Sequence, residues 1–194
     1  MYFDTGSTPS LDGYSRFIDA EKSRITEKEA NVRGELATNL ENAEANQEST
    51  YTAYKYATGV FNTSNTETSN YQKQIQDLKE EMRLAIKMAT EEAQAQGKSQ
   101  DEIDNICWGI STQYSQKIAG IQWHLTKSSG ITSQRQTDSD FAKQQYGEAR
   151  FGTIFASNNY INGLRSLAQD YHNLGKMQQH FNFLDAQSEG GWLG

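Results

Sequence analysis

Proline is almost missing from this chain of 194 residues, since Pro9 is the only one. Proline breaks helices because it lacks a backbone hydrogen-bond donor and clashes with the preceding turn. Without it, long helices are possible through the body of the chain. No segment long enough to form a strand alternates apolar and polar residues, so we expect an all-α protein.

Cysteine and hydrophobic side chains are also scarce. The single cysteine, Cys107, excludes an intrachain disulfide and a cysteine-based metal site. Hydrophobic residues make up 35% of the sequence, which is little for the interior of a compact globule of this length. We therefore expect an elongated bundle of about four helices, with coiled-coil-like seams buried between helices or against other subunits.

Positive charge and histidine are in short supply as well. The chain has 18 basic and 25 acidic side chains and a net charge of −7. A surface that wraps nucleic acid needs an excess of basic residues, so we expect no direct nucleic-acid binding. None of the histidines forms the ExxH motif of di-iron bundles, and His172 and His180 would lie about 12 Å apart along a helix. We expect no metal ligands and no cofactor.

Residues 1–13 have neither the basic nor the apolar segment of a secretory signal. The longest uncharged stretch of note runs from Phe151 to Leu164. It is too short and too rich in Asn and Gly to span a membrane, which takes about 20 apolar residues. We expect no signal peptide, no transmembrane segment, and membrane contact only after a rearrangement.

Apolar residues recur at helical spacing along most of the chain. Leu11, Ile18, Ile25 and Val32 are seven positions apart, and the register shifts between Val32 and Leu36. A second stripe with alternating spacings of four and three comprises Tyr71, Ile75, Leu78, Met82, Ala85 and Ala89. A third comprises Ile103, Cys107, Ile110, Tyr114, Ile118, Ile121 and Leu125. The last comprises Tyr160, Leu164, Leu167, Tyr171, Leu174, Met177, Phe181 and Leu184.

Polar segments separate these stripes. Residues 62–70 and 128–140 are rich in Asn, Ser and Thr, whose side chains compete with the helix for backbone hydrogen bonds, so both are predicted breaks. A third break is predicted at 97–100, where Gly97 can end one helix and Ser99 with Glu102 can start the next. The predicted organisation is a flexible arm at 1–13, a helical bundle at 14–186 and a flexible tail at 187–194.

No set of side chains has the spacing of a catalytic site. The carboxylates of residues 80–92 are interleaved with basic residues, as on a solvated helix face. The segment Gly97-Lys98-Ser99 lacks the earlier glycine of a phosphate-binding loop, because Glu92 stands there. Cys107 lies on an apolar stripe, which favours packing over nucleophilic chemistry. We expect no catalytic residues and no enzymatic activity.

The stripes and the C-terminal tail supply the residues that we expect to contact other helices or subunits. Tyrosine recurs among them, and its large ring with a hydrogen-bonding tip suits a partly polar subunit interface as well as a thin core within one chain. The candidates are Tyr71, Ile75, Leu78, Met82, Tyr160, Leu164, Leu167, Tyr171, Leu174 and Trp192.

Several segments rich in Gln and Ala, such as ATEEAQAQGKSQDEI, FAKQQYGEARF and GKMQQHF, give the chain a characteristic composition. In this composition it resembles the helical internal, ejection or connector-associated virion proteins of tailed bacteriophages. The resemblance carries no diagnostic motif and transfers no functional residues. It implies a structural or assembly subunit that is made in the host cytoplasm and built into the virion as an internal, DNA-ejection or neck or tail component. Its partners would be further copies of itself and other structural proteins of the particle.

Two other classes of function remain open. The first is a secreted helical translocator or membrane-active protein, in which residues 151–164 and Trp192 would meet lipid. The second is a helical-bundle enzyme or ligand-binding protein, although no nucleophile, base and orienting group can be named together.

Overall fold

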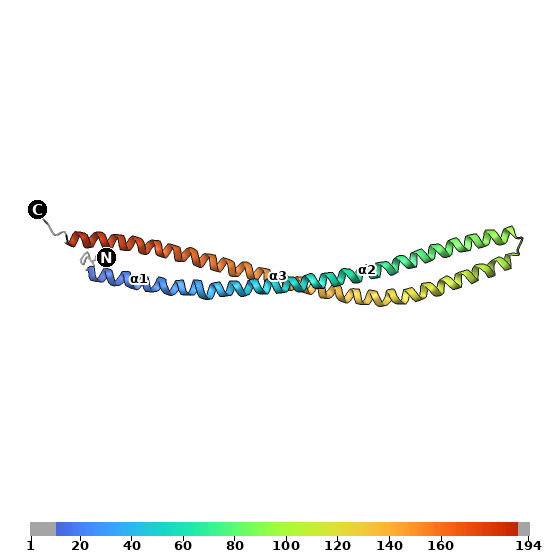
Figure 1. Ribbon diagram of the computed structural model, residues 1–194, viewed down its shortest axis with the longest axis horizontal. Coiled ribbons are helices and arrows are strands. Elements are labelled where there is room, and N and C mark those ends of the chain that lie inside the picture. The colour runs from blue at the N-terminus through green and yellow to red at the C-terminus, as the bar shows by residue number, and fades with distance from the viewer. Residues whose placement is uncertain (1–10, 190–194) are drawn as a thin grey trace, which may run out of the picture. The chain divides into compact units, whose positions relative to one another are not determined.

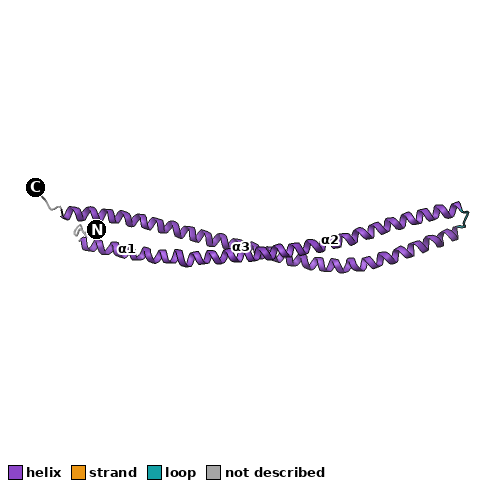
Figure 2. Cartoon of the chain, viewed as in Figure 1, coloured by secondary structure: helices purple, strands orange, loops and turns teal. Residues whose placement is uncertain are grey.

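The computed structural model describes residues 11–189 (Figure 1). Its elements in chain order are α1 (Leu11–Asn31), a π-helical turn η1 (Val32–Leu36), α2 (Ala37–Ala95) and α3 (Gln100–Glu189). Within the described range the chain is helical apart from the turn between α2 and α3 and has no strand, so the all-α prediction is confirmed (Figure 2). In place of about four helices, α3 alone runs for 90 residues and α2 for 59.

The chain divides into two compact units, each of which pairs an earlier with a later stretch of helix. Unit 1 comprises Met1–Ser49 and Gly147–Gly194. In this unit the ring of Tyr14 stacks on that of Phe181, and the hydroxyl of Thr153 donates a hydrogen bond to the carbonyl of Ala43. Residue numbers rise along one helix as they fall along the other, so the two helices of unit 1 are antiparallel.

Unit 2 comprises Thr50–Tyr146 and is built in the same way. Thr58 contacts Ser139, and Thr90 contacts Cys107 near the turn. These pairs also show one helix running against the other. Each unit is therefore an antiparallel pair of helices.

The turn between α2 and α3 falls where the sequence predicts a break. Gly97 has a φ of 70°, in the left-handed region that favours glycine. The N–H of Gly97 donates to the carbonyl of Gln94 and that of Lys98 to the carbonyl of Ala93, which is the hydrogen-bond pattern of a Schellman C-cap. The helix that follows begins with a capping box, in which the N–H of Ser99 donates to the carboxylate of Glu102 over 2.8 Å.

The other two predicted breaks are replaced by continuous helix. Residues 62–70 lie inside α2, and residues 128–140 lie inside α3. Their hydroxyls bond within the helix, as when Thr66 donates to the carbonyl of Asn62 over 2.9 Å. A hydroxyl that donates to the carbonyl four residues earlier is compatible with a continuous helix, so these Ser and Thr residues do not break it.

The ends of the predicted bundle also change. Residues 11–13, assigned to a flexible arm, form the first turn of α1, and α3 continues to Glu189 through the start of the predicted tail. Residues 1–10 and 190–194, including Trp192, lie outside the described range.

The register shift in the sequence coincides with the π-helical turn. Buried and half-buried positions follow alternating spacings of three and four up to Val32, which is buried. The next such position would be Glu35, but Glu35 is exposed and Leu36 is half-buried instead. A π turn takes up one residue more than an α turn. The extra residue is therefore absorbed in η1, and the same side of the helix continues to face its partner.

Gly163 of α3 lies against this turn. A Cβ atom on Gly163 would lie 3.0 Å from Cδ1 of Leu36 and 3.1 Å from Cγ2 of Val32. The two helices of unit 1 thus approach each other closely here because α3 offers no side chain at this position.

The substitution Gly163→Ile is expected to lower the free energy of unfolding by about 1–3 kcal/mol, because four more carbon atoms must fit between packed side chains. Urea denaturation followed by circular dichroism measures the loss. Gly175→Ile is the matched control, since nothing lies within 4 Å of a Cβ there, and the better helix propensity of Ile should offset any cost. Equal urea midpoints for the two variants would contradict the role of Gly163.

The core of unit 1 is a cluster of four buried aliphatic side chains from α1 and α3. Tyr14, Met177 and Phe181 pack against this cluster and cover its end. The four are Ile18, Ile25, Leu167 and Leu174.

Candidate functional site

The contact residues predicted on α2 lie on the side of the helix that faces α3 in unit 2. Ile75 is buried, and Tyr71, Leu78 and Met82 are half-buried. The ring of Tyr71 stacks on His124 of α3 at a centroid distance of 5.8 Å. The apolar stripe of α2 thus packs on α3 within the same chain.

The contact residues predicted on α3 fall into two groups. Leu167 and Leu174 are buried and Tyr160 is half-buried, whereas Leu164 and Tyr171 are 38% and 45% exposed. The less exposed positions are each one residue earlier, at a glycine and an aspartate, although the hydroxyl of Tyr171 still contacts Glu29 of α1. The sequence predicted the apolar neighbour at both places, because aspartate is rarely buried without a partner and glycine has no side chain whose apolar character could mark the position.

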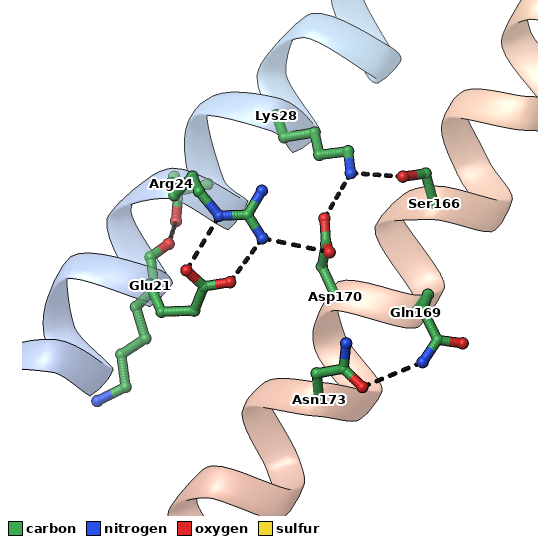
Figure 3. Close-up of polar contacts among 9 residues, drawn as sticks. Glu21, Arg24, Lys28, Ser166, Gln169, Asp170 and Asn173 are labelled. Carbon is green, nitrogen blue, oxygen red and sulfur yellow. Dashed lines mark hydrogen bonds and ion pairs between the residues drawn. The ribbon is translucent and has the colours of Figure 1, made fainter. Parts of the chain in front are cut away.

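Asp170, one of these two residues, is the centre of an ionic cluster between α1 and α3 (Figure 3). Lys28 donates hydrogen bonds to the carboxylate of Asp170 over 2.5 Å and to the hydroxyl of Ser166 over 2.6 Å. Arg24 reaches the second oxygen of Asp170 at 3.2 Å and also pairs with Glu21 at 2.5 Å. Two cations from one helix therefore hold one carboxylate of the other helix.

Hydrogen bonds in this cluster shift the pKa values of its members. The hydrogen bond from Lys28, helped by Arg24, holds the pKa of Asp170 below its ordinary value of 3.8. Beside this cluster, at the residue that follows Lys28, the hydroxyl of Tyr171 donates a hydrogen bond to Glu29 over 2.6 Å. This bond lowers the pKa of Glu29 and raises the pKa of Tyr171.

We expect the cluster to stabilise unit 1 at neutral pH and to lose this effect in acid. A carboxylate whose pKa is lower in the folded than in the unfolded state stabilises the fold above its unfolded pKa, and the contribution disappears as the pH falls through the folded value. Asp170→Asn should therefore be less stable than the unchanged chain at pH 7, and the difference should shrink below pH 4. Thermal unfolding between pH 2.5 and pH 7 measures it; a constant difference would contradict the assignment.

A second polar cluster lies between the helices of unit 2, within the segments predicted as breaks. The hydroxyl of Thr68 lies 2.8 Å from that of Ser128 and 2.9 Å from that of Thr132. About one turn away, the guanidinium of Arg135 donates to the hydroxyl of Ser64. Ser64, Thr68 and Ser128 are buried, and no buried side-chain nitrogen or oxygen in residues 11–187 lacks a hydrogen-bond partner. These hydroxyls form a polar layer between the two helices of unit 2.

Within residues 11–189, the side chains that could bind a metal ion do not come together. Among the described residues, no three of His, Cys, Asp and Glu are placed to hold a metal ion. Cys107 is half-buried, where the sequence predicted burial, and its sulfur lies 3.4 Å from the hydroxyl of Thr90. A shallow depression on α1 between Ala20 and Ala30 is lined by that helix alone.

The most distinctive surface of unit 1 is the outer face of α3, which we define as Phe151, Ile154, Phe155 and Ile161. Their exposed fractions are 77%, 49%, 68% and 41%. Spacings of three, four and seven residues place them on one side of the helix. The buried and half-buried positions from residue 149 to residue 160 fall between them and face the partner helix. These side chains therefore gather on the side of α3 that points away from α1 and α2.

From the sequence, residues 151–164 were identified only as an uncharged stretch. The helix face that packs on the partner helix was not distinguished from the face that is exposed. Polar and small residues fill the positions between the exposed side chains, so the stretch has no simple apolar stripe. The signal that could have revealed it is the recurrence of large apolar residues that are out of phase with the stripe through Leu167 and Leu174.

No helix within residues 11–189 has a stretch that is both long enough and apolar enough to cross a membrane. A search against protein-family models, curated proteins and solved structures gives no match to the chain.

Proposed function

We propose that this chain is a non-enzymatic structural or assembly subunit that docks into a larger multi-subunit particle through the outer face of α3. One observation carries the proposal: four large apolar side chains, 41–77% exposed, lie on the side of α3 opposite its packed partner helix. Apolar side chains gathered on one face mark interaction surfaces, because leaving them in water has a cost that a partner removes.

The packing of each helix pair supports a structural role. Buried and half-buried positions together recur at alternating spacings of three and four, which favours coiled-coil packing between the two helices of a unit. The ionic cluster of unit 1 and the hydroxyl layer of unit 2 use their polar groups to bind the facing helix. Such groups fix the register in which two helices pair.

The particle that we propose is a bacteriophage virion, with the chain as an internal, ejection or neck or tail component. The compositional resemblance of its Gln- and Ala-rich helices supports this choice, and other structural proteins of the virion would be its partners.

Sedimentation of lysates from cells that make the chain tests the proposal. We expect the unchanged chain to sediment with a large particle in a sucrose gradient. Phe151→Glu combined with Phe155→Glu should leave it near the top of the gradient with unchanged helix content. The control is Phe17→Glu, because Phe17 is 54% exposed on α1 and outside the outer face. An unchanged chain that stays at the top would overturn the proposal.

A further inference from the structure

The line of exposed residues that runs through Phe151 and Phe155 on the outer face of α3 has charges of opposite sign at its two ends. The residues of this line are at spacings of three and four and comprise Glu148, Phe151, Phe155, Asn158, Asn162 and Arg165. The apolar residues lie between the acidic and the basic end. All six residues are exposed, and Arg165 is the first charged residue after Arg150.

We propose that the outer face of α3 binds the same face of a second copy of this chain, with the two α3 helices antiparallel about a two-fold axis. The inference rests on the proposed function and names one partner for its docking face. In the antiparallel arrangement Arg165 lies opposite Glu148 of the partner subunit, and the two-fold axis repeats this pair at the other end. A parallel arrangement would bring like charges together at both ends, which disfavours it.

The side chains also match in size when the charged ends are aligned. The axis then passes between residues 156 and 157, so that Phe155 lies opposite Asn158 of the partner subunit and Phe151 opposite Asn162 of the partner subunit. Each aromatic ring meets a smaller side chain, which lets the two helices pack closely. Glu148 has an interaction within its own chain, but a carboxylate accepts several hydrogen bonds and can take a further partner.

The apolar area available fits a reversible dimer. Two Phe and two Ile side chains from each copy would remove roughly 1,000 Å² from water, close to the lower limit for a specific interface. We therefore expect a dissociation constant on the order of micromolar, and further contacts in the particle would add to it.

Analytical ultracentrifugation of the full chain between 1 and 300 μM tests the dimer. We expect a monomer–dimer equilibrium, and Phe155→Ser should raise the dissociation constant at least about 30-fold. Arg165→Glu and Glu148→Arg should each raise it about tenfold, because each places like charges at both ends. Combining the two substitutions should restore dimerisation. A chain that stays monomeric throughout, or a dimer that none of these substitutions weakens, overturns the proposal.

Disulfide cross-linking tests the orientation, in chains whose native cysteine is replaced by Cys107→Ser. One chain carries Glu148→Cys and the other carries Arg165→Cys. Antiparallel pairing predicts that a mixture of the two chains forms cross-linked dimers and that neither chain does so alone. Cross-links within each single variant, and none between the two, would show parallel pairing and overturn the proposal.

The two proposals can fail separately. If the chain is monomeric but still sediments with a particle, the outer face binds a different protein, and only the two-fold pairing is wrong. If the chain dimerises through this face but never joins a particle, the pairing stands and the proposed function fails.

Discussion

Replacement of Ile25 by alanine is expected to lower the free energy of unfolding of unit 1 by about 2–5 kcal/mol. Ile25 is 1% exposed and is the most deeply buried member of the cluster formed with Ile18, Leu167 and Leu174. Its truncation removes apolar contacts and leaves a cavity that two paired helices can fill only by moving together. A pair of helices has no further layer to share the loss.

Hydrogen exchange measured on peptides of the folded chain can localise this effect. Peptides from residues 11–49 and 147–189 should exchange much faster in Ile25→Ala than in the unchanged chain, whereas those from unit 2 should change less. Phe17→Ala is the control, because this larger side chain on the same helix is 54% exposed. The core assignment would fail if the two variants accelerated exchange equally.

Replacement of Thr68 by valine is expected to destabilise unit 2 by about 1–3 kcal/mol, although valine has the same shape and is more apolar. The hydroxyl of Thr68 holds the hydroxyls of Ser128 and Thr132. Its removal leaves buried hydroxyls without that partner, and a buried polar group that loses its partner is costly.

The double variant Thr68→Val with Ser128→Ala distinguishes this cause from a loss of packing. Removing both Thr68 and Ser128 hydroxyls leaves no Ser128 hydroxyl without its partner, so the double variant should lose less stability than the sum of the two single variants. Urea denaturation of the four chains of this cycle measures the coupling. Strictly additive losses would mean that the two hydroxyls do not depend on each other.

Part of the fold could be predicted from the sequence, but the helices that carry this polar layer could not. The all-α class and the turn at Gly97 follow from local signals, namely the lack of proline, the helical spacing and the capping box of Ser99. The helices through 62–70 and 128–140 depend on partners far along the chain, such as Thr68 with Ser128. A run of Ser and Thr looks like a break until the facing hydroxyls are known.

The residues of the candidate site could likewise be predicted only in part from the sequence. Leu167 and Leu174 could be assigned to a contact from spacing alone, because large aliphatic residues favour buried positions. Gly163 and Asp170 could not, since the glycine is needed only where Val32 and Leu36 approach and the aspartate only where α1 supplies cations. The outer face of α3 was not predicted, because the same segment also carries the positions that pack on the partner helix. The two sets of positions alternate along the sequence and hide each other's spacing.

The π-helical turn at Val32–Leu36 lets one helix of the pair carry one residue more than its partner. An insertion of one codon would normally rotate every later side chain of a helix by about 100° and detach it from its neighbour. Here a single wide turn takes up the added residue, and the facing helix needs no matching insertion. Loss of Gly34, which has open space around it, would turn this stretch into ordinary α-helix and leave the downstream pairing in phase. The two paired helices of unit 1 can thus differ in residue count by one and still pack on each other.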